Sequence, residues 1–346
     1  KPRNLTGNRC VYLCNESSLR RLNLRMKKTV FMMMGLALLS TPGQAAKVDK
    51  ANVAKDSKFV VHLDFDAIRT SKLGSTIIKQ AREEEGEERI EAMMEIIGFD
   101  PFTALKGMTM SGNGEEENGL IVLKHAADTK KVVSFIKLDE EYRPTEYKER
   151  TIHSVGQAGE RGYISFVNKS TAVIAPSREL ARDGINLVNG KGAAKKLPGP
   201  IGEISKKAKA PFMMGYADLD GLEDVIEDPT VNDMAREAMM IVGESGDDLV
   251  MSVQVVAQSV ETAEHMHNMV NGLIGFAALG QEENPELKGL LKALKVSRKE
   301  STITVDFKMA VEKILEAVDP ALEDLDVDIG IDLGAKDKDK DEDKDE

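Results

Sequence analysis

The chain has 346 residues, of which 41% are hydrophobic, 31% charged and only 4% aromatic, and its formal net charge is −12. This length accommodates two domains of ordinary size, and the hydrophobic fraction is sufficient for packed cores. With no Trp and 17 Met, the cores are expected to be aliphatic and methionine-rich. The composition argues against an aromatic stacking surface for single-stranded nucleic acid.

The N-terminal region has the three-part layout of a secretory signal peptide. Met26 is followed by two lysines, an apolar stretch at residues 30–39 and small residues ending at Ala45. Ten apolar residues are too few to cross a membrane, which takes about 20. We therefore expect residues 26–45 to be a signal peptide cleaved between Ala45 and Ala46, with the mature chain in the periplasm or secreted. The alternative is tethering to the inner membrane by an uncleaved signal.

Residues 1–25 are basic, lack an apolar face and do not begin with Met, so we interpret them as an extension from a start assigned too early; a long basic region of the signal is the alternative. Both cysteines, Cys10 and Cys14, lie there, so the mature chain is expected to have no disulfide. Removing residues 1–45 takes away eight basic residues and one acidic residue, which leaves a net charge of −19. Such a surface repels nucleic-acid phosphates, and we expect no nucleic-acid partner.

Apolar periodicity and turn residues predict the elements of the mature chain. The predicted strands are 59–63, 108–111, 119–124, 147–154, 162–167, 171–175, 212–217, 248–258, 294–298 and 301–307. The predicted helices are 73–97, one capped by Asp128, 177–189, 225–242, 260–279 and 309–318. In helix 260–279 the residues expected to face inward are Met266, Met269, Val270, Leu273, Ile274 and Ala277. Hairpins alternating with helices indicate an α+β fold with antiparallel sheets.

A short motif, Glu-Ala-Met-Met, occurs at residues 91–94 and again at 237–240. Residues 62–68 also match 216–222, and 169–171 match 300–302, which predicts an internal duplication. We expect two related α+β repeats, each an antiparallel sheet with helices packed on one face. The expected divisions are an extension at 1–25, a signal peptide at 26–45, a linker at 46–57, repeat 1 at 58–190, a linker at 191–211, repeat 2 at 212–320 and an acidic disordered tail at 321–346.

The repeated Asp-x-Asp pairs are the one candidate metal site. Residues i and i+2 of a strand share a face, so Asp64 with Asp66, and Asp218 with Asp220, could present two carboxylates to a hard cation. Helix capping by aspartate is far more common, and we favour capping by the second Asp, with the first in water at the strand end. No cofactor is expected.

Other candidate sites fail on spacing. The acidic run from Asp324 has Ile329 and Ala335 where a calcium loop needs Gly and Glu. His265 and His267 point about 200° apart on a helix, and all five histidines are interpreted as structural or surface residues. The paired methionines of the repeated motif are expected to fill the core. Nucleophile and phosphate-binding motifs are absent, so no catalytic residue is assigned.

The whole pattern resembles families of exported Gram-negative bacterial proteins that carry a signal peptide and two divergent α+β repeats. The resemblance rests on residues 59–68, 147–155 and 169–175; it implies periplasmic residence and transfers no functional site. We expect a non-catalytic periplasmic binding or envelope-associated module, with an envelope protein or a small hydrophobic ligand as partner and no transmembrane span in the mature chain. A hydrophobic-ligand or lipid carrier and a hydrolase acting on envelope material are the alternatives. A cavity between sheet and helices would favour the carrier, and two close, desolvated carboxylates would favour the hydrolase.

Overall fold

A computed structural model describes residues 52–115, 118–139, 141–156, 161–192, 194, 208, 210–220, 222, 233–279 and 285–316. All of them belong to one compact unit, Ala37–Asp324. The expected extension, signal peptide and acidic tail lie outside the described residues, as does most of the segment 191–211. Residues 52–57, expected to be part of a linker, are described: Val53 is buried, and Ala54 forms an antiparallel bridge with Ala194.

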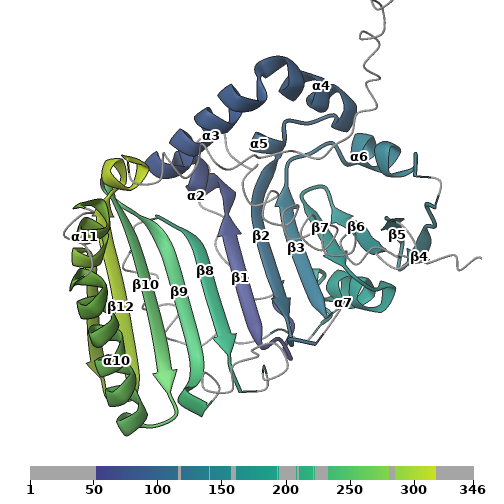
Figure 1. Ribbon diagram of the computed structural model, residues 1–346. Coiled ribbons are helices and arrows are strands. Elements are labelled where there is room, and N and C mark those ends of the chain that lie inside the picture. Colours follow the sequence, from purple (N-terminus) through teal and green to yellow (C-terminus); the bar gives the residue numbers. More distant parts are fainter. Residues whose placement is uncertain are drawn as a thin grey trace, which may run out of the picture. The chain divides into compact units, whose positions relative to one another are not determined.

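The described residues form an antiparallel sheet with helices, which confirms the α+β class (Figure 1). The strands are β1 Phe59–Asp64, β2 Leu105–Gly112, β3 Gly119–His125, β4 Thr145–Tyr147, β5 Arg150–Val155, β6 Gly162–Asn168, β7 Thr171–Ala175, β8 Ala210–Asp218, β9 Ala235–Ser245, β10 Asp248–Ala257, β11 Leu294–Lys299 and β12 Thr302–Ala310. The helices are α2 Phe65–Thr70, α3 Lys72–Glu85, α4 Glu87–Ile97, α5 Pro101–Ala104, α6 Thr129–Ile136, α7 Arg178–Val188, α10 Val260–Leu279 and α11 Pro285–Lys292.

All twelve strands form one sheet in the order β11-β12-β10-β9-β8-β1-β2-β3-β7-β6-β5-β4. β1 and β8 are hydrogen-bonded neighbours in its middle, as Figure 1 shows. The expectation of a separate sheet for each repeat is therefore wrong, because the first strands of the two halves pair with each other. The join buries the two edges that separate sheets would have exposed.

Directly paired residues share a face, so the register defines the two faces of the sheet. One face carries a continuous apolar row: Phe166, Ala172, Leu123, Met108, Leu63, Met213, Val242, Met251 and Phe307. We call it the α6 face, because α6 and α10 lie over it. The opposite, or α7, face is covered by α7, whose Ala181 and Ile185 pack on Val122 and Val173.

Helices α2 to α5 follow β1 and lead into β2, and α2, α3 and α5 each begin at an Asp or Ser side-chain cap. Asp100 accepts a hydrogen bond from the Phe102 amide at the start of α5, with Pro101 in the first turn. Gly98 ends α4 in the left-handed conformation with φ 79°. The predicted single helix over 73–97 is wrong, because Gly86, with φ 76°, separates α3 from α4.

The two sides of the central β1–β8 pair have the same strand order, β1-β2-β3-β7-β6 on one side and β8-β9-β10-β12-β11 on the other. In the first half Asp64 pairs with Gly107, and Lys106 forms a bulge next to that pair. The corresponding residues of the second half are Asp218, Glu237 and Arg236. Residues 62–68 and 216–222, which match in sequence, thus also lie at the same place in the strand pairing of each half, next to a bulge.

The ends of β3 and β10 correspond as well. The His125 amide donates to the Ser170 carbonyl at 3.0 Å, and the Ala257 amide donates to the Ser301 carbonyl at 2.8 Å. His125 and Ala257 therefore occupy equivalent positions, each leading into a helix on the α6 face. This correspondence agrees with the sequence match between 169–171 and 300–302.

The repeated Glu-Ala-Met-Met motif has a different structure in each copy. Residues 91–94 lie in helix α4, whereas residues 237–240 lie in strand β9. The predicted helix over 225–242 is therefore wrong for residues 235–242. Met239 is only 1% exposed, in agreement with the core assignment, and the Met93 side chain lies outside the described residues.

Three smaller predictions are also corrected. The predicted strand 147–154 is a hairpin of β4 and β5, whose turn residues Lys148 and Glu149 have φ of 46° and 61°. The final helix begins at Val311 rather than at residue 309, since β12 continues to Ala310. On α10, Met269 and Leu273 were expected to face inward but are 51% and 62% exposed.

Candidate functional site

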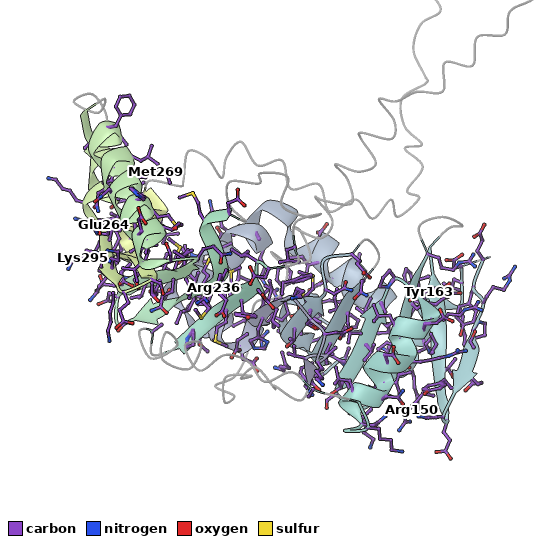
Figure 2. The ribbon with its side chains drawn as sticks, turned by 90° about the horizontal axis from the view of Figure 1, so that it is seen from below. Arg150, Tyr163, Arg236, Glu264, Met269 and Lys295 are labelled. Atoms are coloured by element: carbon purple, nitrogen blue, oxygen red, sulfur yellow. The ribbon has the colours of Figure 1, made fainter. Side chains whose placement is uncertain are left out.

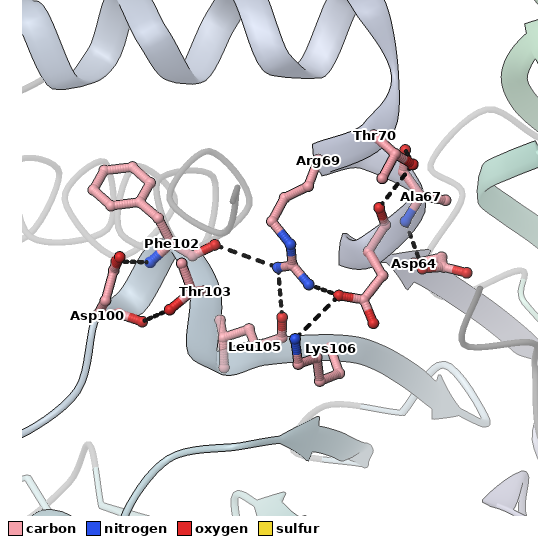
Figure 3. A network of polar contacts seen from close by, with 10 residues as sticks. Asp64, Ala67, Arg69, Thr70, Asp100, Phe102, Thr103, Leu105 and Lys106 are labelled. Atoms are coloured by element: carbon pink, nitrogen blue, oxygen red, sulfur yellow. Dashed lines mark hydrogen bonds and ion pairs between the residues drawn. The ribbon is translucent and has the colours of Figure 1, made fainter. Parts of the chain in front are cut away.

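The first predicted carboxylate pair, Asp64 and Asp66, is bound within the protein. Asp64 is buried and caps α2 by accepting the Ala67 amide at 2.9 Å. Asp66, also buried, forms ion pairs with Arg69 and with Lys106, the latter at 3.3 Å (Figure 3). Capping is thus performed by the first aspartate of the pair and not by the second, and neither carboxylate lies in water as an open ligand.

Arg69 connects this cluster to the next strand. Its guanidinium donates to the carbonyls of Phe102 and Leu105 at 3.3 and 2.8 Å (Figure 3). Burial lowers the pKa of Arg69, opposed by the charges of Asp64 and Asp100, and an arginine remains charged at any physiological pH. Burial and the Arg69 charge also lower the pKa of Lys106. The arrangement holds α2 against the β2 bulge, which is a structural role.

The second pair, Asp218 and Asp220, is held by Lys58. Its ammonium lies 3.1 Å from Asp218 Oδ2 and donates to the Asp220 carbonyl at 2.8 Å. Gln258 donates to Asp220 Oδ1 at 3.3 Å. Among the residues that the structure describes, no group of three or more His, Cys, Asp or Glu side chains is placed to hold a metal ion.

A groove between α6 and the sheet is the better candidate site. It encloses about 630 Å³, within the range of small-molecule sites. α6 and its C-cap residue contribute Thr129, Lys130, Val133 and Lys137; the other lining residues are Tyr142, Pro144, Glu146, Glu149, Arg150, Thr151, His153 and Phe166. In Figure 2, Arg150 marks the sheet edge at which the groove lies. These residues come from α6, the loop after it, the β4–β5 hairpin and β6.

The inner wall of the groove is a rigid aromatic cluster. Tyr142 Oη lies 2.7 Å from His153 Nδ1, and the two rings stack with centroids 5.9 Å apart. Phe166 stands between two imidazoles, His153 at 6.2 Å and His125 at 5.7 Å, the latter edge-on. His125 and His153 are only 3% and 6% exposed. The cluster therefore offers a ligand a fixed wall that needs no reordering on binding.

The titratable groups of this wall are neutral near pH 7. Burial lowers the pKa of His153, aided by the Lys137 charge and opposed by Glu146. Burial also lowers the pKa of His125, opposed by the Ala127 backbone. Neither His125 ring nitrogen makes a hydrogen bond of good geometry with the described residues. Burial and the Glu146 charge raise the pKa of Tyr142, so its hydroxyl stays protonated.

The rim of the groove is cationic. Lys130, Lys137 and Arg150 are exposed there, and in the described part of the chain none of the three forms an ion pair. The acidic lining residues are Glu146, which accepts the Thr151 hydroxyl at 2.8 Å, and Glu149 in the hairpin turn. In a chain of net charge −12, this local excess of positive charge favours an anionic ligand.

The place in the second half that corresponds to the α6 groove is closed. Ala257, in the place of His125, packs with Ala263 of α10, Ile303 and Met266. Arg298 lies where the first half has Phe166, and it reaches Glu264 of α10 at 3.5 Å. α10 is thus held on the sheet by buried aliphatic contacts and an ion pair, whereas α6 has no buried residue.

The groove residues were not identified from the sequence. His125 and His153 were interpreted as structural or surface residues; both prove to be buried, and Phe166 brings them together. They come from separate strands, so no spacing marks them. A second groove of about 700 Å³ lies at the ends of β10 and β12 beside α11, with Lys292, Lys295, Lys308 and Lys313 among its lining residues.

Among the described residues, no helix is long and apolar enough to span a membrane. No protein-family model matches the chain, and no curated protein matches it in sequence. Solved structures that match include crystal forms III and I of TP0453, each 10% identical, with TM-scores of 0.47 and 0.46. Each alignment covers 80% of this chain, and 99% and 98% of the respective TP0453 chain.

Proposed function

We propose that the protein is an exported, non-catalytic binding module of the Gram-negative envelope and that the α6 groove is its ligand site. The observation that carries this proposal is the contrast between two equivalent helices on one sheet. α10 is packed down over Ala257 and Ile303, while α6 stands over an open groove with an aromatic wall. The signal-peptide pattern at residues 26–45 supports export.

We further propose that the two halves descend from one duplicated unit. The shared strand order and the bulges at Lys106 and Arg236 support this history. Bulges are specific local features, and one at the same place in each half is unexpected without common origin. In this proposal the two halves have since diverged, because the second has a closed helix–sheet contact and the first an open groove.

Of the two alternatives, the groove favours a carrier of a small, partly apolar ligand. It lies between a helix and the sheet, as a carrier cavity would. A hydrolase would need two desolvated carboxylates free to act on a substrate. The aspartates that are buried or repeated in the sequence are instead engaged by Arg69, Lys106 and Lys58.

Co-purification tests the proposal directly. The protein is isolated from the envelope of its host and examined by native mass spectrometry, alongside Val133→Arg, which fills the groove with a long charged side chain. Ser134→Arg is the matched control, because Ser134 is exposed on the same helix outside the groove lining. A bound small molecule in the wild type and in Ser134→Arg, but not in Val133→Arg, is expected. A ligand retained by Val133→Arg would contradict the site.

Export has its own test. N-terminal sequencing of the mature product is expected to begin at Ala46. An intact Met26 on a cytoplasmic product would contradict export and leave the groove proposal unaffected.

A further inference from the structure

We propose that the ligand of the α6 groove is a small amphiphilic monoanion, such as a medium-chain carboxylate, with its head at the cationic rim and its apolar body against Phe166. This inference rests on the proposed function and names the ligand class for the same site. It follows from three properties of the groove: the sign of its rim, the chemistry of its wall and its size.

The rim selects for a single negative charge. Lys130, Lys137 and Arg150 outnumber Glu146 and Glu149 by one, so the lining carries one net positive charge. A cationic ligand would meet three unpaired positive side chains. A dianion would leave one charge uncompensated and face two carboxylates at the same rim. A monoanion matches the local balance.

The three cations converge from two elements. Lys130 of α6 and Lys137, the residue that caps the C-terminus of α6, lie seven positions apart, which is about two helical turns and places them on the same side. Arg150 begins β5 on the facing wall. Lys137, like Lys130 and Arg150, is among the residues that line the groove. A head group between the two elements is contacted from both.

The wall below the rim is partly apolar and fixed. Val133 and Pro144 line the groove with the Phe166 ring, and two buried imidazoles hold that ring in place. The Tyr142 hydroxyl and His153 Nδ1 are occupied by each other, so the wall has few free polar groups to satisfy. A flexible alkyl chain needs only such a surface, because its burial is driven by apolar area.

The volume limits the length of the apolar body. At about 630 Å³ the groove suits a small molecule and not a bilayer surface or a folded partner. A ligand that fits here is taken up one molecule at a time. A one-to-one complex is therefore expected.

Three probes with unbranched alkyl chains of nine or ten carbons and different head groups test the ligand class: decanoate, decanol and decyltrimethylammonium. Isothermal titration calorimetry on the full mature chain is expected to give a single decanoate site, with decanol at least tenfold weaker and the cation weaker still. Lys137→Gln and Arg150→Gln should each lower the affinity for decanoate at least tenfold and change the affinity for decanol by less than twofold. Both side chains are exposed, so neither substitution disturbs the core.

Lys313→Gln is the matched control, because Lys313 is an exposed lysine in the second groove. It should leave decanoate affinity within twofold. Equal affinity for all three probes, no binding of decanoate, or an equal loss in Lys313→Gln would each overturn the monoanion assignment. The proposed function fails separately, if Val133→Arg retains the co-purifying ligand.

Discussion

Replacing Arg69 with Met tests whether the buried ion cluster at the end of β1 holds the first half of the molecule together. Methionine fills a similar space with an unbranched apolar chain, so the change removes charge and hydrogen bonds with little loss of volume. Asp66 is then left with Lys106 alone at 3.3 Å, and the carbonyls of Phe102 and Leu105 lose their donor.

The expected loss of unfolding free energy follows from these contacts. A hydrogen bond from a charged donor contributes about 1.5–3 kcal/mol, and Arg69 makes two to carbonyls. Removing one member of a buried ion pair costs about 3–5 kcal/mol because the partner stays buried with less compensation. Relaxation and the remaining Lys106 contact reduce the sum, so we expect a loss of about 3–5 kcal/mol in total.

Urea denaturation followed by far-ultraviolet circular dichroism measures this loss as a lower midpoint at unchanged slope. Arg82→Met is the matched control: Arg82 pairs with Asp100 at 2.9 Å but is partly exposed, so about 1 kcal/mol is expected. Adding Asp66→Asn to Arg69→Met should recover part of the loss, since the uncompensated charge is removed. If Arg69→Met proves no more destabilising than Arg82→Met, the structural role of the cluster is refuted.

Three further outcomes are expected. Met239→Asp buries a charge at a side chain 1% exposed, so thermal melting should show a loss of about 4 kcal/mol or more, and unchanged melting would contradict the core assignment. Because the pKa values of His125 and His153 are lowered in the folded state, the unfolded chain binds more protons below about pH 6.5. The free energy of unfolding should therefore fall as the pH drops below that value, by up to about 1.4 kcal/mol per pH unit for each histidine. Urea denaturation at several pH values measures this slope, which should be flatter in the variant with both histidines changed to Gln. Gly184→Ala places a Cβ 2.5 Å from a core methyl group, so the free energy of unfolding, measured from the denaturant midpoint, should fall by about 1–3 kcal/mol. Gly275→Ala adds a Cβ in open space on a helix and should be neutral or stabilising by up to about 1 kcal/mol.

Local signals predicted many elements correctly because their causes are local. The caps at Asp128 and Ser177 begin α6 and α7 as predicted, and α10 has the predicted bounds. β10 and the β11–β12 hairpin lie where the alternation of apolar and polar residues predicted strands. In each case a cap, a turn or a clear period lies within a short window of sequence.

β9 was missed because its cause is not local. Residues 237–242 read Glu-Ala-Met-Met-Ile-Val, a run without alternation whose first residues favour helix. The segment is a strand because β8 and β10 pair with both of its edges. Apolar side chains on both faces of an inner strand remove the period-2 signal that would have identified it.

The groove was missed for a related reason. Lys137, Arg150 and Phe166 come from the end of a helix, a hairpin and another strand, and only the strand order β7-β6-β5 brings them to one groove. The repeated Asp-x-Asp pairs were visible because their residues adjoin in sequence, but these residues form a cap and three ion pairs. The residues that lie close together in the sequence have structural roles, whereas the candidate binding residues come together only in the folded protein.

If the protein is exported as proposed, the pairing of β1 with β8 has a consequence for the order in which it folds. Lys58 and Asp218, which meet at this seam, are 160 positions apart. A chain crossing a membrane from its N-terminus would present β1 long before β8 arrives, so the β1 edge of the seven strands β1 to β7 would stay open in the interval. Such an edge invites pairing with other chains, and a periplasmic holdase would protect it until the second half closes the sheet.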